Sequence, residues 1–198
     1  MTRIIGGIAG GRRLRTPTGD ATRPTADRVR EALFSALEAE LGSLHGLRFL
    51  DLYAGSGAVG LEAASRGAVG VTAVESDQRT ARLVVANATT LSLDVDVRAL
   101  RVSTVLATTP GSAYDVVFLD PPYPLAADEV SRALALLVAN DWVSPGGAVV
   151  VERSARSVAP AWPEGLELRR HKKYGETVLW YLRRGSDTFG DGGPPAVT

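Results

Sequence analysis

Hydrophobic positions along the middle of the chain switch repeatedly between two spacings. Short unbroken apolar runs are typical of strands buried on both faces of a parallel sheet. Between these runs, apolar residues recur every three or four positions, which is the period of an amphipathic helix. We expect strands at residues 48–52, 71–75, 95–102, 114–120 and 147–152, and helices at 59–66, 80–91 and 127–140.

The two ends of the chain follow other patterns. Residues 166–174 and 177–184 read as two strands joined at Gly175, and therefore as an antiparallel hairpin. Near the start, apolar residues recur at helical spacing as far as Leu41, after Thr25 as an N-cap. This order predicts an α/β fold with a mostly parallel, seven-stranded sheet that ends in the antiparallel hairpin.

Composition divides the chain into three segments. Residues 1–24 are rich in Gly, Arg and Thr, and predict a basic N-terminal arm that is extended or hairpin-like. Residues 25–184 hold the alternating strands and helices of one domain. Residues 185–198 have almost nothing to bury, so we expect a disordered tail.

Composition also restricts the class of protein. The chain has 198 residues, of which 45% are hydrophobic, and this suffices for one domain with a substantial core. The absence of cysteine excludes disulfides and thiolate metal sites, and His45 and His171 lie too far apart in sequence to suggest a metal site. Because no apolar stretch has the length of a membrane span or a signal peptide, we expect a cytoplasmic protein, and a monomer by default.

The charges are unevenly distributed, although the formal net charge is zero. Arginines outnumber carboxylates within residues 1–30, and basic residues do so again within residues 169–184. A polyanion responds to the local potential rather than to the net charge. The pattern favours a nucleic-acid partner over two merely solvated faces.

A glycine-rich loop follows the first strand of the domain. The glycines Gly55, Gly57 and Gly60 form the pattern G-x-G-x-x-G and open a helix, so the backbone can turn sharply and approach a ligand closely. Glu75 ends the next strand, where a carboxylate accepts hydrogen bonds from ribose hydroxyls. Strand, loop, helix and acid in this order predict a site for a nucleotide-like ligand.

Asp51 decides which nucleotide-like ligand we expect. Its negative charge, four residues before Gly55, would discourage a pyrophosphate and suit a ligand with a cationic amino-acid end. S-adenosylmethionine has an ammonium and a sulfonium and no phosphate, and D-x-x-x-G-x-G is similar to the first motif of Rossmann-like methyltransferases. The expected cofactor-binding residues are Asp51, Tyr53, Ala54, Gly55, Ser56, Gly57 and Glu75, with Ser103 and Thr104 after the third strand as either adenine contacts or a plain turn.

The sequence Asp120-Pro121-Pro122-Tyr123 follows the fourth strand. The prolines fix the backbone and remove two N–H donors, so carboxylate and carbonyl acceptors remain beside a flat aromatic ring. This set fits an aromatic base that bears an NH2 group, and it resembles the fourth motif of amino-methyltransferases. We expect these four residues to be catalytic, with the target base flipped out or unpaired.

Several segments together resemble the bacterial small-subunit rRNA methyltransferases of the RsmD type. The resemblance rests on the two motifs above, on R-P-T-A-D-R-V-R-E-A-L-F at residues 23–34, and on residues 3–7, 11–14 and 173–177. It implies a class I S-adenosylmethionine methyltransferase fold, and methyl transfer to the exocyclic N2 of a guanine in 16S rRNA, naked or in a partly assembled small subunit. The missing acid after the third strand is a departure from the family pattern.

Basic residues beside the glycine loop are candidates for holding RNA phosphates. For Arg30, pairing within the protein with a helix carboxylate such as Glu31 is a nearly equal alternative. The expected RNA-binding residues are Arg12, Arg13, Arg23, Arg28, Arg30, Lys173 and Tyr174.

Three other functions each fit part of the pattern. The D-P-P-Y motif would equally serve an adenine-N6 or cytosine-N4 methyltransferase, although no separate DNA-recognition domain is evident. An NAD(P)-dependent oxidoreductase would use the glycine loop and Glu75 but would leave D-P-P-Y unexplained. A non-catalytic RNA-binding assembly factor that kept the fold is the third.

Overall fold

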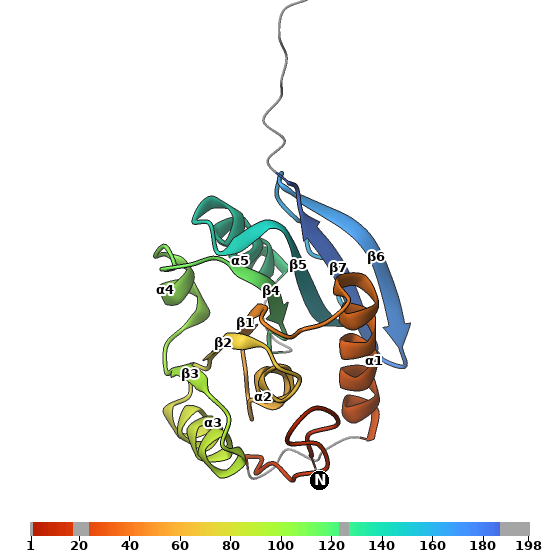
Figure 1. Cartoon of the computed structure of the whole chain (residues 1–198). Coiled ribbons are helices and arrows are strands. Elements are labelled where there is room, and N and C mark those ends of the chain that lie inside the picture. The colour runs from red at the N-terminus through yellow and green to blue at the C-terminus, as the bar shows by residue number, and fades with distance from the viewer. Residues whose placement is uncertain (1, 18–23, 123–126, 187–198) are drawn as a thin grey trace, which may run out of the picture.

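The computed structural model describes residues 2–17, 24–122 and 127–186. Its centre is a seven-stranded sheet in the order β3-β2-β1-β4-β5-β7-β6, in which β7 and β6 run antiparallel to the other strands (Figure 1). The predicted mostly parallel sheet with its antiparallel hairpin is confirmed. The strands are β1 (Arg48–Leu52), β2 (Val69–Val74), β3 (Val95–Arg98), β4 (Tyr114–Leu119), β5 (Val143–Ser154), β6 (Leu166–Tyr174) and β7 (Thr177–Arg184).

Helices cover both faces of the sheet, and each face has its own hydrophobic cluster. Alternate residues of one strand enter different clusters: Phe118 packs on the side of α1, α2 and α3, whereas Leu119 packs on the side of α4 and α5. Because both faces are covered, the central strands are hydrophobic throughout. The helices are α1 (Pro24–Leu41), α2 (Ala58–Ser65), α3 (Gln78–Leu91), α4 (Val102–Leu106) and α5 (Ala127–Ala139).

The segment 95–102 differs from its prediction. Strand β3 ends at Arg98, and Val102 begins the short helix α4 instead of ending a strand. Valine favours strands locally, but Val102 and Val105 are spaced three residues apart and are both buried against the cluster that includes α5. Tertiary packing therefore selects the helix.

Smaller differences occur at other element ends. Helix α1 begins at Pro24, one residue before the predicted N-cap Thr25, and proline is well suited to a first helical turn. Strand β5 starts at Val143 rather than at Gly147, through an irregular stretch in which Gly146 has φ 72°. None of the described helices combines the length and hydrophobicity that crossing a bilayer requires.

The N-terminal arm forms a hairpin that lies against α2 and α3 (Figure 1). An antiparallel bridge joins Arg3 to Arg13, and the Ile4 N–H donates to the Arg12 carbonyl over 2.9 Å. The Ile4 side chain is completely buried in the cluster beneath. The arm is thus part of the core on this side of the sheet.

Glu62 of α2 fixes the arm in place. Its completely buried carboxylate accepts hydrogen bonds from the backbone N–H groups of Ile5 at 2.7 Å and Gly6 at 2.8 Å. It also accepts from Arg66 Nε at 2.8 Å and lies 3.8 Å from Arg30 Nε. A buried carboxylate is stable only when it is paired and hydrogen-bonded in this way.

Close backbone packing adds to this attachment. Gly7 has φ +75°, and a Cβ atom there would lie 1.9 Å from the Ser65 carbonyl oxygen. Ala9 N–H donates to Ser65 Oγ over 2.9 Å, and Ser65 Oγ donates to the Gly6 carbonyl over 2.6 Å. Only glycine permits this approach, so the arm follows one path across the end of α2.

We expect Glu62→Ala to lower the free energy of unfolding by about 3–5 kcal/mol, because it leaves the buried Arg30, the half-buried Arg66 and two N–H groups without their acceptor. The matched control is Glu38→Ala, which removes a more exposed carboxylate that lies 2.9 Å from Arg66. This variant should cost about 0–1 kcal/mol. Urea unfolding monitored by circular dichroism measures both values, and equal losses would contradict the role given to Glu62.

Candidate functional site

Three parallel strands, β1, β2 and β4, end side by side at one edge of the sheet, and the pairing of β4 with β5 ends at the same level. Leu52 of β1 is paired with Val74 of β2 and Leu119 of β4, and Leu119 is paired with Val151 of β5. The next residue of each strand therefore lies in one row across the edge, and Asp120 N–H still donates to the Leu52 carbonyl over 3.3 Å. The residues of this row, from β2 to β5, are Glu75, Tyr53, Asp120 and Glu152.

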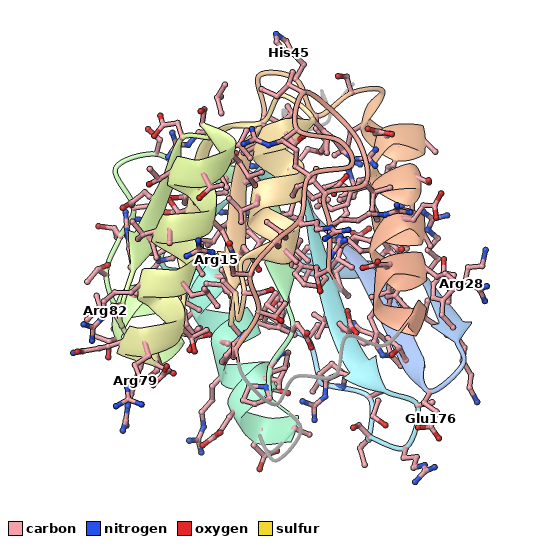
Figure 2. All side chains as sticks on the ribbon, turned by 90° about the horizontal axis from the view of Figure 1, so that it is seen from below. Arg15, Arg28, His45, Arg79, Arg82 and Glu176 are labelled. Carbon is pink, nitrogen blue, oxygen red and sulfur yellow. The ribbon has the colours of Figure 1, made fainter. Side chains whose placement is uncertain are left out.

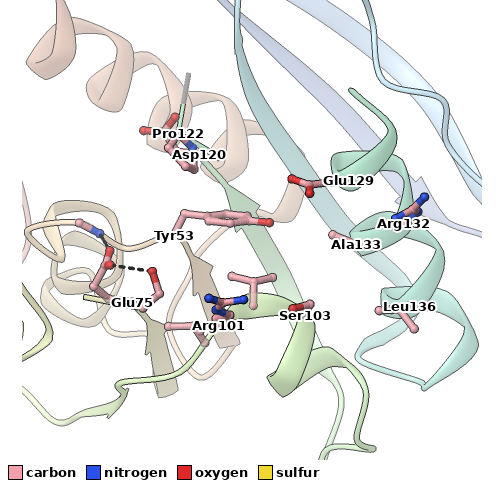
Figure 3. Close-up of a pocket in the computed structure, with 14 residues that line it drawn as sticks. Tyr53, Glu75, Arg101, Ser103, Asp120, Pro122, Glu129, Arg132, Ala133 and Leu136 are labelled. Carbon is pink, nitrogen blue, oxygen red and sulfur yellow. Dashed lines mark hydrogen bonds between the residues drawn. The ribbon is translucent and has the colours of Figure 1, made fainter. Parts of the chain in front are cut away.

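A cavity of about 760 Å³ lies between this row and the helices α4 and α5 (Figure 3). Its position matches the place where ligands bind in α/β proteins, outside the carboxyl ends of the strands. The strand ends and their loops contribute Tyr53, Gly55, Val74, Glu75, Ser76, Asp120 and Pro122, and the helical side contributes Arg101, Val102, Ser103, Glu129, Arg132, Ala133 and Leu136.

The glycine loop joins β1 to α2 beside the cavity. Gly55 has φ 53° and lines the cavity, and no atom within 4 Å would meet a Cβ there. Gly57 has φ 79° as the N-cap of α2, and a Cβ atom there would lie 2.6 Å from Val84 Cγ1. The predicted sharp turn is present. Its glycines leave the backbone open to the cavity at Gly55 and allow close packing against α3 at Gly57.

Glu75 holds this loop from the neighbouring strand. One carboxylate oxygen accepts the Gly55 N–H over 3.0 Å, and the other accepts the Asp77 N–H over 2.8 Å. A carboxylate has about four acceptor positions. Glu75 therefore keeps capacity for hydroxyl groups of a ligand in the cavity that it lines.

Tyr53 places an aromatic ring in the cavity between strand ends and helix α5 (Figure 3). Its φ of 63° is rare for a residue with a side chain, and such conformations cost free energy and occur at functional sites. Burial raises the pKa of its hydroxyl, the Glu129 charge raises it further, and Arg153 opposes both. The ring is thus a neutral, flat surface within the site.

Asp51 requires a correction. Its side chain does not line the cavity; it is 1% exposed and accepts the Gly60 N–H over 2.8 Å. Burial raises the pKa of Asp51 to about 7, the Gly60 hydrogen bond lowers it, and the charges of Asp120 and Glu75 raise it further. Asp51 binds the first turn of α2, because an N-terminal helix N–H is an open donor. Its predicted role toward a cofactor stays a prediction.

Asp120 and Pro122 line the cavity, whereas Pro121 is buried beside them. Asp120 presents surface to the cavity, but protein surrounds it on the other sides. This burial raises the pKa of Asp120 to about 6, against the lowering effect of the Arg153 guanidinium. Tyr123 lies outside the described residues, so its predicted stacking role stays a prediction.

The predicted adenine contacts separate in the structure. Ser103 lines the cavity, but Thr104 is exposed on α4 and is not part of the lining. The other expected loop residues, Ala54 and Ser56, also lie outside the lining, and the Ser56 carbonyl accepts a hydrogen bond from Asn87 at 3.2 Å.

Several residues of the site were not predicted from the sequence. Arg101 follows β3, in the region where the family pattern has an acidic residue that this chain lacks. Its guanidinium points into the cavity (Figure 3). Glu129 and Arg132 are three residues apart on α5, and this spacing after D-P-P-Y is a signal that one helix face turns toward the site. Glu152 carried no motif signal, and only the strand register places it.

The expected RNA-binding residues have different surroundings. Arg30 requires a correction, because it is only 5% exposed, lies 3.1 Å from Asp27 and is the buried neighbour of Glu62. The guanidinium of Arg12 donates to the Thr90 and Leu91 carbonyls at the end of α3. Arg28 is exposed and projects from α1 (Figure 2).

The remaining candidates also differ. Arg13 and Lys173 are exposed, and Tyr174 is half-buried with Lys172 Nζ at 5.4 Å from its ring centroid. Arg23 lies outside the described residues.

Sequence comparisons identify relatives along almost the whole chain. A family model described as "Conserved hypothetical protein 95" matches residues 2–183. The "Ribosomal RNA small subunit methyltransferase D" of Escherichia coli K12 is 35% identical over 183 residues, which are 92% of this chain and 89% of that protein. The protein of the same name from Haemophilus influenzae is 35% identical over 177 residues, or 87% of this chain and 89% of its own length.

Solved structures agree with this result. The structure described as "Putative methyltransferase yhhF from Escherichia coli" superposes with a TM-score of 0.81 at 34% identity, over 93% of this chain and 98% of its own. The magnesium protoporphyrin IX methyltransferase of Synechocystis, solved with bound SAM, shares the fold with a TM-score of 0.65 at 13% identity, over 81% of this chain and 80% of its own. The chain has the class I methyltransferase fold and belongs to the ribosomal RNA small subunit methyltransferase D family.

Proposed function

We propose that this protein transfers the methyl group of S-adenosylmethionine to the exocyclic N2 amine of a guanine in 16S rRNA. The observation that carries the proposal is that Asp120 and Pro122 line the same cavity as Gly55 and Glu75. Hydrogen-bond acceptors for an amine and groups suited to a nucleoside thus line the same cavity. The relatives named as ribosomal RNA small subunit methyltransferase D support the choice of substrate.

The residues present fit S-adenosylmethionine better than a dinucleotide. A pyrophosphate binds at a helix N-terminus through free N–H groups. Here the Gly60 N–H of α2 is already bound by the Asp51 carboxylate, and Glu75 and Asp120 lie close enough to raise the pKa of Asp51. A cationic sulfonium ligand suits such an acidic floor, whereas a pyrophosphate would be repelled.

Each residue would have a separate task. Glu75 would accept the ribose hydroxyls, and Ser103 and Arg101 would border the adenine. When bound, S-adenosylmethionine supplies an electrophilic methyl group: the new C–N bond forms as the S–C bond breaks, and the electron pair stays on sulfur. Asp120 would accept a hydrogen bond from the target amine and then its proton, and most of the acceleration would come from positioning and electrostatics.

The first prediction concerns Asp120. We expect Asp120→Ala to lower the rate of methyl transfer by about 10²–10⁴, because the amine loses its acceptor, while affinity for S-adenosylhomocysteine stays within about threefold. The assay combines radiolabelled methyl donor with naked 16S rRNA and with small subunits from a strain that lacks the modification, followed by digestion to nucleosides.

The label also tests the proposed function itself. We expect the wild-type protein to produce N2-methylguanosine. Label in N6-methyladenosine or N4-methylcytidine would show that the target is adenine or cytosine instead of guanine. The oxidoreductase alternative would be supported by two results together: the wild type transfers no label, and its melting temperature is raised by NADH but not by S-adenosylmethionine. A retained rate in Asp120→Ala would refute only the role of Asp120.

The second prediction concerns Glu75. Glu75→Gln should weaken the binding of S-adenosylhomocysteine about tenfold, since a charged acceptor of hydroxyl groups becomes neutral. Isothermal titration calorimetry measures the dissociation constant. Asp128→Asn is the matched control, because it removes an exposed carboxylate of α5 outside the cavity lining and should leave the constant unchanged.

The third prediction separates two arginines of α1. The exposed Arg28 is proposed to contact an RNA phosphate, so Arg28→Ala should reduce the slope of log affinity against log salt by about one and leave the melting temperature unchanged. Arg30→Ala should instead lower the melting temperature, because it leaves Glu62 short of a cation. Filter binding at several salt concentrations and thermal unfolding measure the two effects, and a salt slope unchanged by Arg28→Ala would remove this contact.

A further inference from the structure

Glu152 lies directly beside Asp120 at the edge of the sheet. Leu119 and Val151 are the last paired residues of β4 and β5, and both belong to the hydrophobic cluster on the α4 and α5 side. Asp120 follows Leu119, and Glu152 follows Val151, so the two residues lie side by side on neighbouring chain segments at this edge. The two carboxyl groups are close enough for the charge of Asp120 to act on Glu152.

The neighbours of this pair offer little compensation. Across β5, Glu152 is paired with Leu179 of β7, which is completely buried and apolar. Glu152 itself is half-buried. Among the described residues, the Arg153 guanidinium acts on Asp120, the carboxyl groups of Asp120 and Glu75 act on the buried Asp51, and Glu129 acts on Tyr53 of the same row. The charged side chains of α4 and α5 that face the edge across the cavity are Arg101, Glu129 and Arg132.

We propose that Asp120 and Glu152 form a carboxyl pair, in which Glu152 is a positioning residue that sets how strongly Asp120 accepts the proton released by the target amine. The inference rests on the proposed function for the identity of that amine. The proposal adds Glu152 to the site, a residue that belongs neither to the glycine-rich loop nor to the D-P-P-Y motif.

The electrostatics of the pair agree with this arrangement. Burial and the negative charge of Asp120 together raise the pKa of Glu152 to about 8, whereas burial opposed by Arg153 raises the pKa of Asp120 to about 6. Two interacting carboxyl groups lose their protons in two steps that belong to the pair. Near neutral pH the pair therefore holds one proton and one negative charge.

The proton balance gives the pair its function. An amine that gains a methyl group becomes positively charged and must release one proton. Near neutral pH the singly charged pair accepts this proton at Asp120 and becomes neutral. Above the second step, both groups are charged. The pair then binds the released proton more strongly, because the proton relieves the repulsion between two neighbouring carboxylates.

The sign of the pH dependence follows. Both pKa values are raised, so Asp120 is protonated and unable to accept a proton below about pH 6, and the transfer rate should rise as the pH increases through about 6. It should rise a second time through about pH 8, when Glu152 loses its proton. Glu152→Gln removes a titrating group and should abolish the second rise while the first stays near pH 6.

The experiment measures single-turnover methyl transfer to small subunits between about pH 5.5 and 9 for the wild type, Glu152→Gln and Glu152→Asp. Glu152→Asp keeps a carboxyl group and should restore the second rise. The control Glu176→Gln changes an exposed carboxylate in the β6–β7 turn and should give the wild-type profile. Affinity for S-adenosylhomocysteine should be the same in all four proteins. A wild-type profile in Glu152→Gln would overturn the proposal.

A second readout needs no RNA. In carboxyl-labelled protein, NMR titration should show Glu152 titrating near pH 8, and Asp120→Asn should move this titration to lower pH because the neighbouring charge is gone. An unchanged Glu152 titration in Asp120→Asn would overturn the pair. If the wild type does not methylate rRNA at any pH, the proposed function fails, and the NMR result still decides whether the pair exists.

Discussion

The common register of four neighbouring parallel strands is the constraint on which the site depends. Leu52, Val74, Leu119 and Val151 are aligned across β1, β2, β4 and β5, so these strands leave the hydrophobic interior at the same height. A slip of one residue in any strand would turn its next side chain to the other face. Packing of aliphatic side chains thus places the polar groups of the cavity, although none of these groups contributes to that packing.

The edge is acidic, although the protein as a whole is neutral. Asp51, Asp120 and Glu152 are all held in surroundings that raise their pKa values. Their raised pKa values mean that such groups accept protons readily, and in their charged form they attract a cation and repel a polyanion. The exposed basic groups, such as Arg28 on α1 and Lys173 on β6, lie on other elements. An RNA substrate would therefore be held away from the edge by its phosphates, with only a neutral base entering.

Periodicity was enough to predict the order of strands and helices, because each buried strand carries an unbroken apolar run. It failed for residues 95–106, where valine suits a strand locally and only packing selects α4. Motif spacing correctly brought Glu75 and Asp120 to one cavity, since the carboxyl ends of parallel strands meet. Motif spacing could not predict where the side chains of Asp51 and Arg30 point, because each is held by a residue of α2 that no motif links to it.

The attachment of the arm to α2 has a consequence for synthesis of the chain. The Ile5 N–H and the Glu62 carboxylate that binds it are 57 residues apart. At a translation rate of about 5–20 residues per second, the arm waits for several seconds before its partner exists. Throughout that time the backbone N–H groups of Ile5 and Gly6 have no Glu62 to bind, and Arg12 has no end of α3 to bind. The arm can therefore become fixed only after α2 has been made, although it precedes α2 in the chain, and until then the nascent chain carries a cationic segment without these partners.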